Sequence, residues 1–398
     1  MVYCMNYPVT ALSVAYFIIS TLLLPLMVQA FSCLVAWIIS LISSKMRNKN
    51  IITMVVSLLF LAAYFYLYSK MGDIISGLIA NGTAIAVAFK KYAFPAYYFG
   101  VGIAEHNLTY LLLYTVCTLA VFELVYAILS RSFRQITTAK KGTARIKYKE
   151  RSMHVSSPAA ALLRKDFRHF IGNPMYVLNA WMGEILLVVA CVAMLIKKDI
   201  LTEFLPILNG EGEIMGLILC VILCGLSCTN LITAPSISLE GKNLWIAQSI
   251  PVHAGVVLRA KVKLQMLLCI PITALSALLM GIVLKLELLT LVLAVLVPAA
   301  FNLFTALLGV VVNLHFPKFD YINETVVIKQ SMSTMICMFG SMAVVLVLAL
   351  LYALLLSASV APTLFLAVCL VLLVIVCVLM WRYLGHGGSA RFAALQAD

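Results

Sequence analysis

The stretch at residues 288–314, LLTLVLAVLVPAAFNLFTALLGVVVNL, decides the fold class of this chain. It holds no charged residue and one proline, Pro298, and it exceeds the roughly 20 residues that an α-helix needs to cross a bilayer core. A lipid-facing barrel strand alternates apolar and polar residues and cannot produce such a run. We therefore expect a transmembrane helix here.

The composition extends this expectation to most of the chain. Of the 398 residues, 64% are hydrophobic and only 11% are charged, and the mean hydropathy is +1.09. Soluble domains are about half apolar and a quarter charged. These values exclude a cytosolic enzyme, a secreted disulfide scaffold and a disordered regulator. Because lipid leaves helices as the only fit for such runs, we expect an all-α polytopic membrane protein.

Apolar runs of sufficient length predict about nine transmembrane helices. They lie at residues 10–42, 51–69, 108–130, 175–196, 214–233, 264–284, 288–314, 332–356 and 361–381. This order predicts three spans in residues 1–130, a basic linker with an interfacial helix in 131–174, a six-span core in 175–381 and a tail in 382–398.

Lysine and arginine set the orientation of these spans, since cytoplasmic loops are enriched in both. An external amino terminus leaves only six basic residues outside: Lys70, Lys90, Lys91, Lys197, Lys198 and Lys285. The other basic residues then lie inside, as does the carboxyl terminus. The net charge of +13 therefore indicates topology rather than nucleic-acid binding. No basic residue precedes the first span, so we expect no cleavable signal peptide.

Two segments outside the spans are unusual. After Ser157, a helix at 158–171 has an apolar stripe that includes Phe167 and a basic stripe of Arg164, Lys165 and Arg168, which is typical of a helix lying in the inner membrane interface. A soluble linker is the alternative. The apolar stretch at 74–89 of the external segment 72–107 is too short and too polar to span, so this segment is either a re-entrant hairpin or a flat interfacial loop.

The first three spans resemble the last three in order. The first and seventh spans each contain one proline at a similar depth, Pro25 and Pro298, and each is followed by two further spans. This pattern predicts half of one six-helix core followed by one complete six-helix core. Three more spans are then expected upstream of Met1.

Few residues in the spans could carry chemistry. Glu123 and Glu184 are the intramembrane acids, and such charges are costly and usually functional. The histidines and carboxylates form no catalytic pattern, so we expect no catalytic residue, cofactor or metal. Cys220, Cys224 and Cys228 share a helix face and could offer thiolates to a soft metal, although close helix packing is the favoured reading.

The loop at residues 234–263 predicts a protein-docking surface. It combines charged residues with Leu244 and Trp245 in short helical pieces interrupted by Pro251. A loop that only sets topology requires the charges but not the tryptophan. An amphipathic surface inside the cell is typical of a docking site.

The segment LLRKDF at 162–167, the string SLEGKNLW at 238–245 and the stretch from Ile250 to Lys261 resemble permease subunits of bacterial type-two ABC exporters. The resemblance implies an inner-membrane protein with an elbow helix at 158–171, a coupling helix within 236–263 and a separate ATP-binding cassette subunit as partner. A second permease copy and membrane lipid are further partners it implies. The coupling residues would be Glu240, Gly241, Lys242, Trp245, Pro251 and Lys261.

Other functions remain open at this stage. A secondary transporter requires coupling-ion ligands near the middle of the membrane, and a membrane enzyme requires clustered acids or histidines at an interface. A polytopic protein without transport activity is also compatible. The sequence contains no GxxxxGK[ST] phosphate loop, so any ATP must be bound by another polypeptide.

Overall fold

The computed structural model describes residues 11–44, 49–81, 87, 89–105, 107–138, 156–196, 212–356 and 359–396. The expected linker segment at 139–155, the loop at 197–211 and the last two residues of the tail lie outside these ranges. Within them all regular elements are helices, which confirms an all-helical polytopic protein. The chain divides into two compact units, residues 1–151 and 152–398.

Unit 1 contains α2 (Ala11–Ser44), α3 (Lys49–Ser69), α4 (Met71–Ala80), α6 (Phe94–Ala104) and α7 (Leu108–Thr138). The long helices α2 and α7 pack against each other, and α6 packs on both. Stacking of Tyr98 on Tyr110, with ring centroids 5.8 Å apart, joins α6 to α7. Most apolar side chains of α2 are exposed, as expected for a helix that faces lipid.

The described part of the external segment predicted at 72–107 contains most of α4, all of α6 and further helical residues at 87 and 89–92. Residues Thr53–Ser69 of α3 and Met71–Gly77 of α4 form an apolar pair bent by 49°. Such a pair is either a broken span, which the sequence did not predict, or a re-entrant element, and the choice between the predicted re-entrant hairpin and flat interfacial loop stays a prediction. The arrangement of unit 1 as half of a repeated core also stays a prediction.

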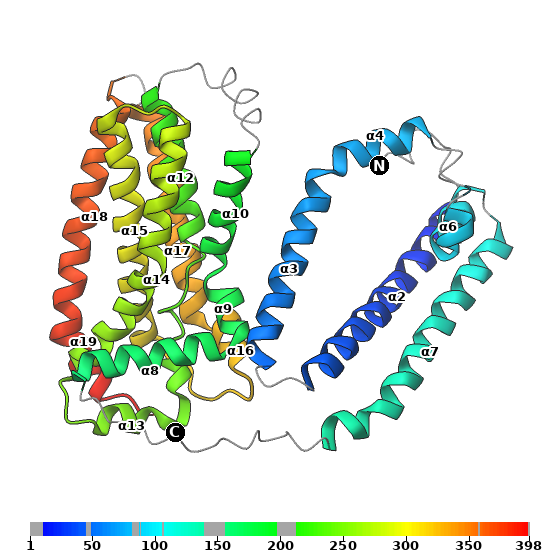
Figure 1. Cartoon of the computed structure of the whole chain (residues 1–398), viewed down its shortest axis with the longest axis horizontal. Helices are drawn as coiled ribbons and strands as arrows, with labels where there is room; N and C mark the ends of the chain where they lie inside the picture. Colours follow the sequence, from blue (N-terminus) through cyan, green and yellow to red (C-terminus); the bar gives the residue numbers. More distant parts are fainter. Residues whose placement is uncertain are drawn as a thin grey trace. The chain divides into compact units, whose positions relative to one another are not determined.

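Unit 2 is a bundle of six longer helices (Figure 1), and the prediction that residues 175–381 form a core of six membrane spans stays a prediction. They are α10 (Met182–Ile196), α12 (Gly212–Ser227), α14 (Ala254–Val283), α15 (Leu288–His315), α17 (Met332–Leu351, followed by η3, Tyr352–Leu356) and α18 (Pro362–Gly385). Short helices lie outside the bundle core: α8 (Pro158–Gly172), α9 (Pro174–Ala180), η2 (Ser238–Asn243), α13 (Leu244–Ser249), α16 (Glu324–Gln330) and α19 (Gly387–Ala393).

Helix α15, the stretch from which the fold class was predicted, is the centre of unit 2. It packs against α12, α14, α17 and α18, and half of its most apolar window is buried, more than in any other described span. Its proline, Pro298, lies inside the helix, as Pro25 does in α2. A central helix of this kind positions polar side chains such as Asn302 and Asn313 where several neighbours reach them.

Six described helices are long and apolar enough to cross a membrane, and a seventh is added if the bent pair is one span. Helices α10 and α12 are apolar but shorter, and the residues between them lie outside the described ranges. The count of nine therefore stays a prediction. Helices α8, α13, α16 and α19 lie at one end of unit 2 (Figure 1), and η2 packs on α13 and α16 there. We call this end the basic end because it exposes Arg164, Lys165, Arg168, Lys242 and Lys329.

Candidate functional site

Helix α8 begins where the sequence predicted it. Ser157 caps the helix by accepting a hydrogen bond from the backbone N–H of Ala160 at 3.4 Å, and Pro158 occupies the first helical position. Leu162 and Phe170 are buried, and Phe167 is half-buried. The predicted basic stripe of Arg164, Lys165 and Arg168 is exposed. The amphipathic pattern thus fixes which face of α8 meets the bundle.

Asn313 of α15 holds the short helix η2. Its Oδ1 accepts from the backbone N–H groups of Ile237 and Ser238 at 2.8 and 3.1 Å, and its Nδ2 donates to Ser238 Oγ at 2.7 Å and Ser333 Oγ at 3.1 Å. The side chain of the central helix thereby provides an acceptor for two backbone N–H groups at the start of η2, which have no partner within a helix.

Gly241 allows η2 to turn into α13. Its φ is 54°, a conformation that side-chain-bearing residues rarely adopt. A Cβ at this position would lie 2.9 Å from the hydroxyl oxygen of Tyr321, which itself donates to the carbonyl of Leu239 at 3.3 Å. Both the positive φ and the lack of room for a Cβ atom require glycine at this position.

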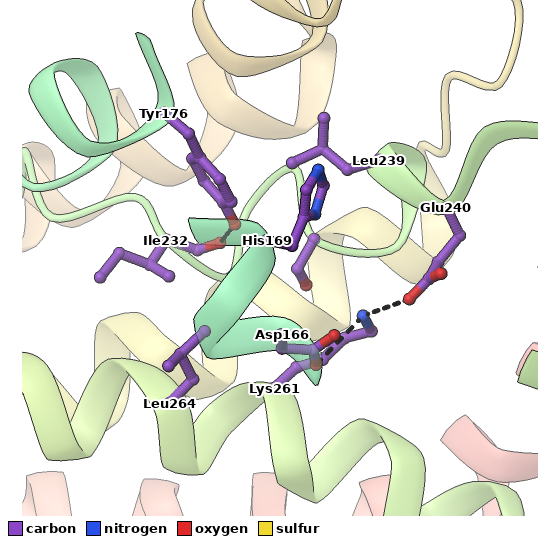
Figure 2. Close-up of a pocket in the computed structure, with 9 residues that line it drawn as sticks. Asp166, His169, Tyr176, Ile232, Leu239, Glu240, Lys261 and Leu264 are labelled. Atoms are coloured by element: carbon purple, nitrogen blue, oxygen red, sulfur yellow. Dashed lines mark hydrogen bonds and ion pairs between the residues drawn. The ribbon is translucent and has the colours of Figure 1, made fainter. Parts of the chain in front are cut away.

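Four charged side chains meet between α8, η2 and α14, and we call Lys165, Asp166, Glu240 and Lys261 the charge cluster. Figure 2 shows Asp166, Glu240 and Lys261. Lys261 Nζ donates to Glu240 Oε1 at 2.8 Å and lies 3.5 Å from Asp166 Oδ2. Lys165 Nζ reaches Glu240 Oε2 at 2.7 Å. The Lys261 side chain is only 3% exposed, whereas that of Lys165 is 49% exposed. The buried lysine therefore depends on the two acids for its compensation.

These contacts decide the ionisation of Glu240. Burial alone raises the pKa of its carboxyl, but the charges of Lys261 and Lys165 and their hydrogen bonds outweigh burial and lower the pKa to about 2. Glu240 is therefore an anion throughout the physiological range. The charge cluster is a permanent ionic link between three elements.

A small pocket adjoins the cluster and is lined by residues that include His169, Tyr176 and Ser236. Figure 2 shows Tyr176 and His169 directed into it, with Glu240 and Lys261 at one side. Its volume of about 20 Å³ is room for about one water molecule. It is too small for a transported substrate.

Helix α13 presents apolar side chains to solvent from a fixed position. Trp245 is 63% exposed and Ile246 is 47% exposed, while Leu244 and Ala247 on the other face are buried. Gln248 Nε2 donates to the carbonyls of Phe392 and Leu395, both at 2.9 Å, and so ties α13 to the chain around α19. An exposed indole on a rigid support is typical of a docking surface.

The six predicted coupling residues do not form one surface. Glu240 and Lys261 meet in the charge cluster and Gly241 is buried beside Tyr321, so these three shape the loop. Lys242, Trp245 and Pro251 are exposed. The exposed apolar surface of this loop is therefore on α13, and it includes Ile246, which was not singled out from the sequence.

A second polar group lies inside the bundle, and we call Glu184, Ser227, Asn230, Thr273 and Asn302 the buried polar network. None is more than 1% exposed. Glu184 Oε1 accepts from Thr273 Oγ1 at 2.7 Å and from Asn230 Nδ2 at 2.9 Å. Asn302 Nδ2 donates to Thr273 Oγ1 at 2.9 Å and Ser227 Oγ at 3.0 Å. Glu184 Oε2 has no hydrogen-bond partner among the described residues.

Gln265 of α14 extends this network toward the basic end. Its Oε1 accepts from the backbone and hydroxyl of Thr233, at 3.0 and 2.9 Å, and its Nε2 donates to the carbonyl of Asn230 at 3.0 Å. The chain after α12 is irregular here, and Gln265 satisfies its backbone groups inside the bundle. The network thus links α10, α14, α15 and the end of α12.

The sequence singled out Glu184 but not its partners. An asparagine or threonine within an apolar run is a visible signal, and Asn230, Thr273 and Asn302 each provide it, but their pairing requires the fold. Glu123 differs, since it is exposed on α7. No group of three or more His, Cys, Asp or Glu residues arranged for a metal occurs in the part of the chain described.

Comparison with known proteins identifies the chain at the level of a family. No curated protein and no solved structure matches it. Residues 2–382 match the family described as "Membrane protein of 12 TMs". The match overturns the resemblance to type-two ABC exporter permeases: the strings in 162–167 and 238–245 are short, and the match that covers nearly the whole chain is to another family. The chain is a multi-pass membrane protein and belongs to this family of twelve-span membrane proteins.

Proposed function

We propose that this protein is the membrane subunit of a transporter and that its basic end docks a separate ATP-hydrolysing subunit. The observation that carries the proposal is the exposed face of α13, where Trp245 and Ile246 project from the end of the bundle. Large exposed apolar side chains outside the predicted membrane spans are unfavourable in water and mark an interaction site.

The connections of α13 support a mechanical role for this surface. Gln248 joins it to α19, Asn313 joins the preceding η2 to α15, and Glu240 joins η2 to α8 and α14. A displacement of α13 by a partner would therefore be passed to α14 and α15, which also carry part of the buried polar network. Bistable packed helices convert small displacements into rearrangements of a bundle.

A separate subunit is proposed because the sequence offers no site of its own for nucleotide hydrolysis. The nearest string to a phosphate loop, at residues 240–243, has Gly241 and Lys242 but lacks the first glycine and the hydroxyl residue. In the structure Gly241 is buried beside Tyr321, and its neighbour Glu240 is anionic. An anion beside the turn repels phosphate.

Photo-crosslinking tests the docking surface. A benzophenone amino acid replaces Trp245, and a control carries it at Leu354, which is 76% exposed in η3 after the far end of α17. We expect position 245, and not position 354, to capture a protein with a nucleotide-binding fold in cells. The captured protein, co-reconstituted with the full chain, should hydrolyse ATP faster than alone. Capture at neither position, or no stimulation, contradicts the proposal.

Removing the indole of Trp245 measures how much this side chain contributes to the association. Trp245→Ala should weaken association with that subunit at least tenfold, as expected for a central tryptophan of an interface. Leu354→Ala should leave association unchanged. An affinity of Trp245→Ala equal to that of the wild type would show that α13 is not the docking site.

The buried polar network favours a second candidate, a secondary transporter. Glu184 is a carboxylic acid inside the bundle with one oxygen unpartnered among the described residues, and such acids commonly bind a coupling ion. Transport by reconstituted protein that follows an ion gradient without any ATPase, and that Glu184→Gln abolishes, would support this candidate over the first.

A further inference from the structure

A groove on the outside of the bundle lies between α15 and α18 near the basic end. It is lined mainly by apolar side chains, among them Leu303 and Leu307 of α15 and Val374, Val378 and Trp381 of α18, and its volume is about 250 Å³. Val374 and Val378 are 47% exposed on the outer face of α18. In a membrane this groove is open to lipid and has room for part of an alkyl chain.

Positive charge lies at one end of the groove. Arg382, in the last turn of α18, lines the groove and is exposed. The guanidinium of Arg259 lies over the ring of Trp381, 5.1 Å from its centroid, and Arg259 Nε is buried without a hydrogen-bond partner among the described residues. No acidic residue lines the groove in the part of the chain that the structure describes. Two arginines without a described carboxylate partner therefore flank the indole where the apolar groove ends.

The occupant must match both parts of this surface. An apolar groove with a cationic end fits a molecule with an alkyl chain and an anionic head, and basic pockets between transmembrane helices bind acidic lipid head groups. Lipid is also the medium that surrounds α18, whose outer face exposes a continuous row of valine, leucine and isoleucine side chains.

We propose that this groove is a binding site for an anionic phospholipid. One acyl chain lies along Leu303, Leu307 and Val378, and the phosphate meets Arg382, with Arg259 behind Trp381 adding positive charge. This site is independent of the docking surface on α13, since none of the α13 residues lines it.

Native mass spectrometry of the purified full chain tests this site by titration with phosphatidylglycerol and with phosphatidylcholine of the same chains. The wild type should bind at least one phosphatidylglycerol more tightly than phosphatidylcholine. Arg382→Gln should weaken the phosphatidylglycerol affinity about fivefold, the contribution expected for one arginine at a membrane surface, and should leave phosphatidylcholine unchanged. Arg382→Lys should keep most of the preference.

Two control variants distinguish loss of this site from a general change in charge or in the surface of α18. Lys329→Gln removes an exposed positive charge at the same end of unit 2, on α16, and should bind like the wild type. Val378→Trp fills the groove and should weaken binding of both lipids, whereas Val371→Trp, at another exposed position of α18, should not. Equal binding of the two lipids by the wild type, or unchanged binding in both Arg382→Gln and Val378→Trp, would overturn the proposal.

Discussion

The buried ammonium group of Lys261 makes the stability of the fold depend on its acidic partners. Its side chain is 3% exposed, and Glu240 at 2.8 Å supplies its closest compensation, since Asp166 is 3.5 Å away. Glu240→Gln should therefore lower the free energy of unfolding by about 3 kcal/mol, because it leaves a buried ammonium incompletely paired. Denaturant unfolding in detergent measures the loss. Lys242→Gln, at the exposed neighbour in η2, should change stability by less than about 0.5 kcal/mol; an equal loss in both variants would contradict the account.

Glu240 also makes the stability of the fold depend on pH. Glu240 has a pKa lowered from its ordinary 4.5 to about 2, so the folded state binds fewer protons than the unfolded state and stability rises with pH. The stability advantage of the wild type over Glu240→Gln should be constant above about pH 5, where both states are ionised. It should shrink as the pH falls below 4.5 toward 2. An advantage that does not change with pH in this range would show that the ion pairs do not supply it.

Glu184 is constrained by hydrogen bonds rather than by ion pairs. Its Oε1 accepts from Thr273 and Asn230, and no cation pairs with it among the described residues. Glu184→Gln preserves an acceptor oxygen and should keep the bundle folded. Glu184→Leu removes the acceptor that Thr273 and Asn230 share, which leaves them only Cys269 O at 3.0 Å and Asn302 Oδ1 at 3.3 Å, and should cost about 1–3 kcal/mol. Thermal unfolding of the two variants compares them, and equal stability would mean that the network does not hold α10 to α14.

At the scale of elements, long apolar runs could be predicted and side-chain pairings could not. The spans at 264–284, 288–314 and 361–381 became α14, α15 and α18 because lipid selects helices from apolar runs, with boundaries that differ by between zero and ten residues. The predicted role of Glu240 as a surface contact differs from its position in the structure. Its partner Lys165 is 75 residues away in sequence, and no local pattern records such a pairing.

The η2 turn carries a prediction of its own. Gly241→Ala places a side chain at a φ of 54° and 2.9 Å from the Tyr321 hydroxyl, so we expect a loss of about 1–3 kcal/mol and displacement of α13. Crosslinking from position 245 should fall in this variant while the helix content by circular dichroism stays unchanged. Gly340→Ala, at a helical glycine with open space around the added methyl group, is the matched control. Unchanged crosslinking in Gly241→Ala would indicate that the turn does not position α13.

For the whole molecule, the account rests on which side of the membrane the basic end of unit 2 faces. The positive-inside rule places it in the cytoplasm, where an ATP-hydrolysing subunit can reach α13. The family match shows a multi-pass membrane protein, and the orientation is part of our proposal. Lys285, in the turn between α14 and α15, marks the opposite end of the same helices.

Cysteine labelling in intact cells tests this orientation most directly. Lys242→Cys and Lys285→Cys are introduced singly at exposed positions, with the unsubstituted chain as the control for labelling of native cysteines. A membrane-impermeant maleimide should label Lys285→Cys in intact cells and label Lys242→Cys only after permeabilisation. Labelling of Lys242→Cys in intact cells would place α13 outside, out of reach of ATP, and would contradict the proposed function.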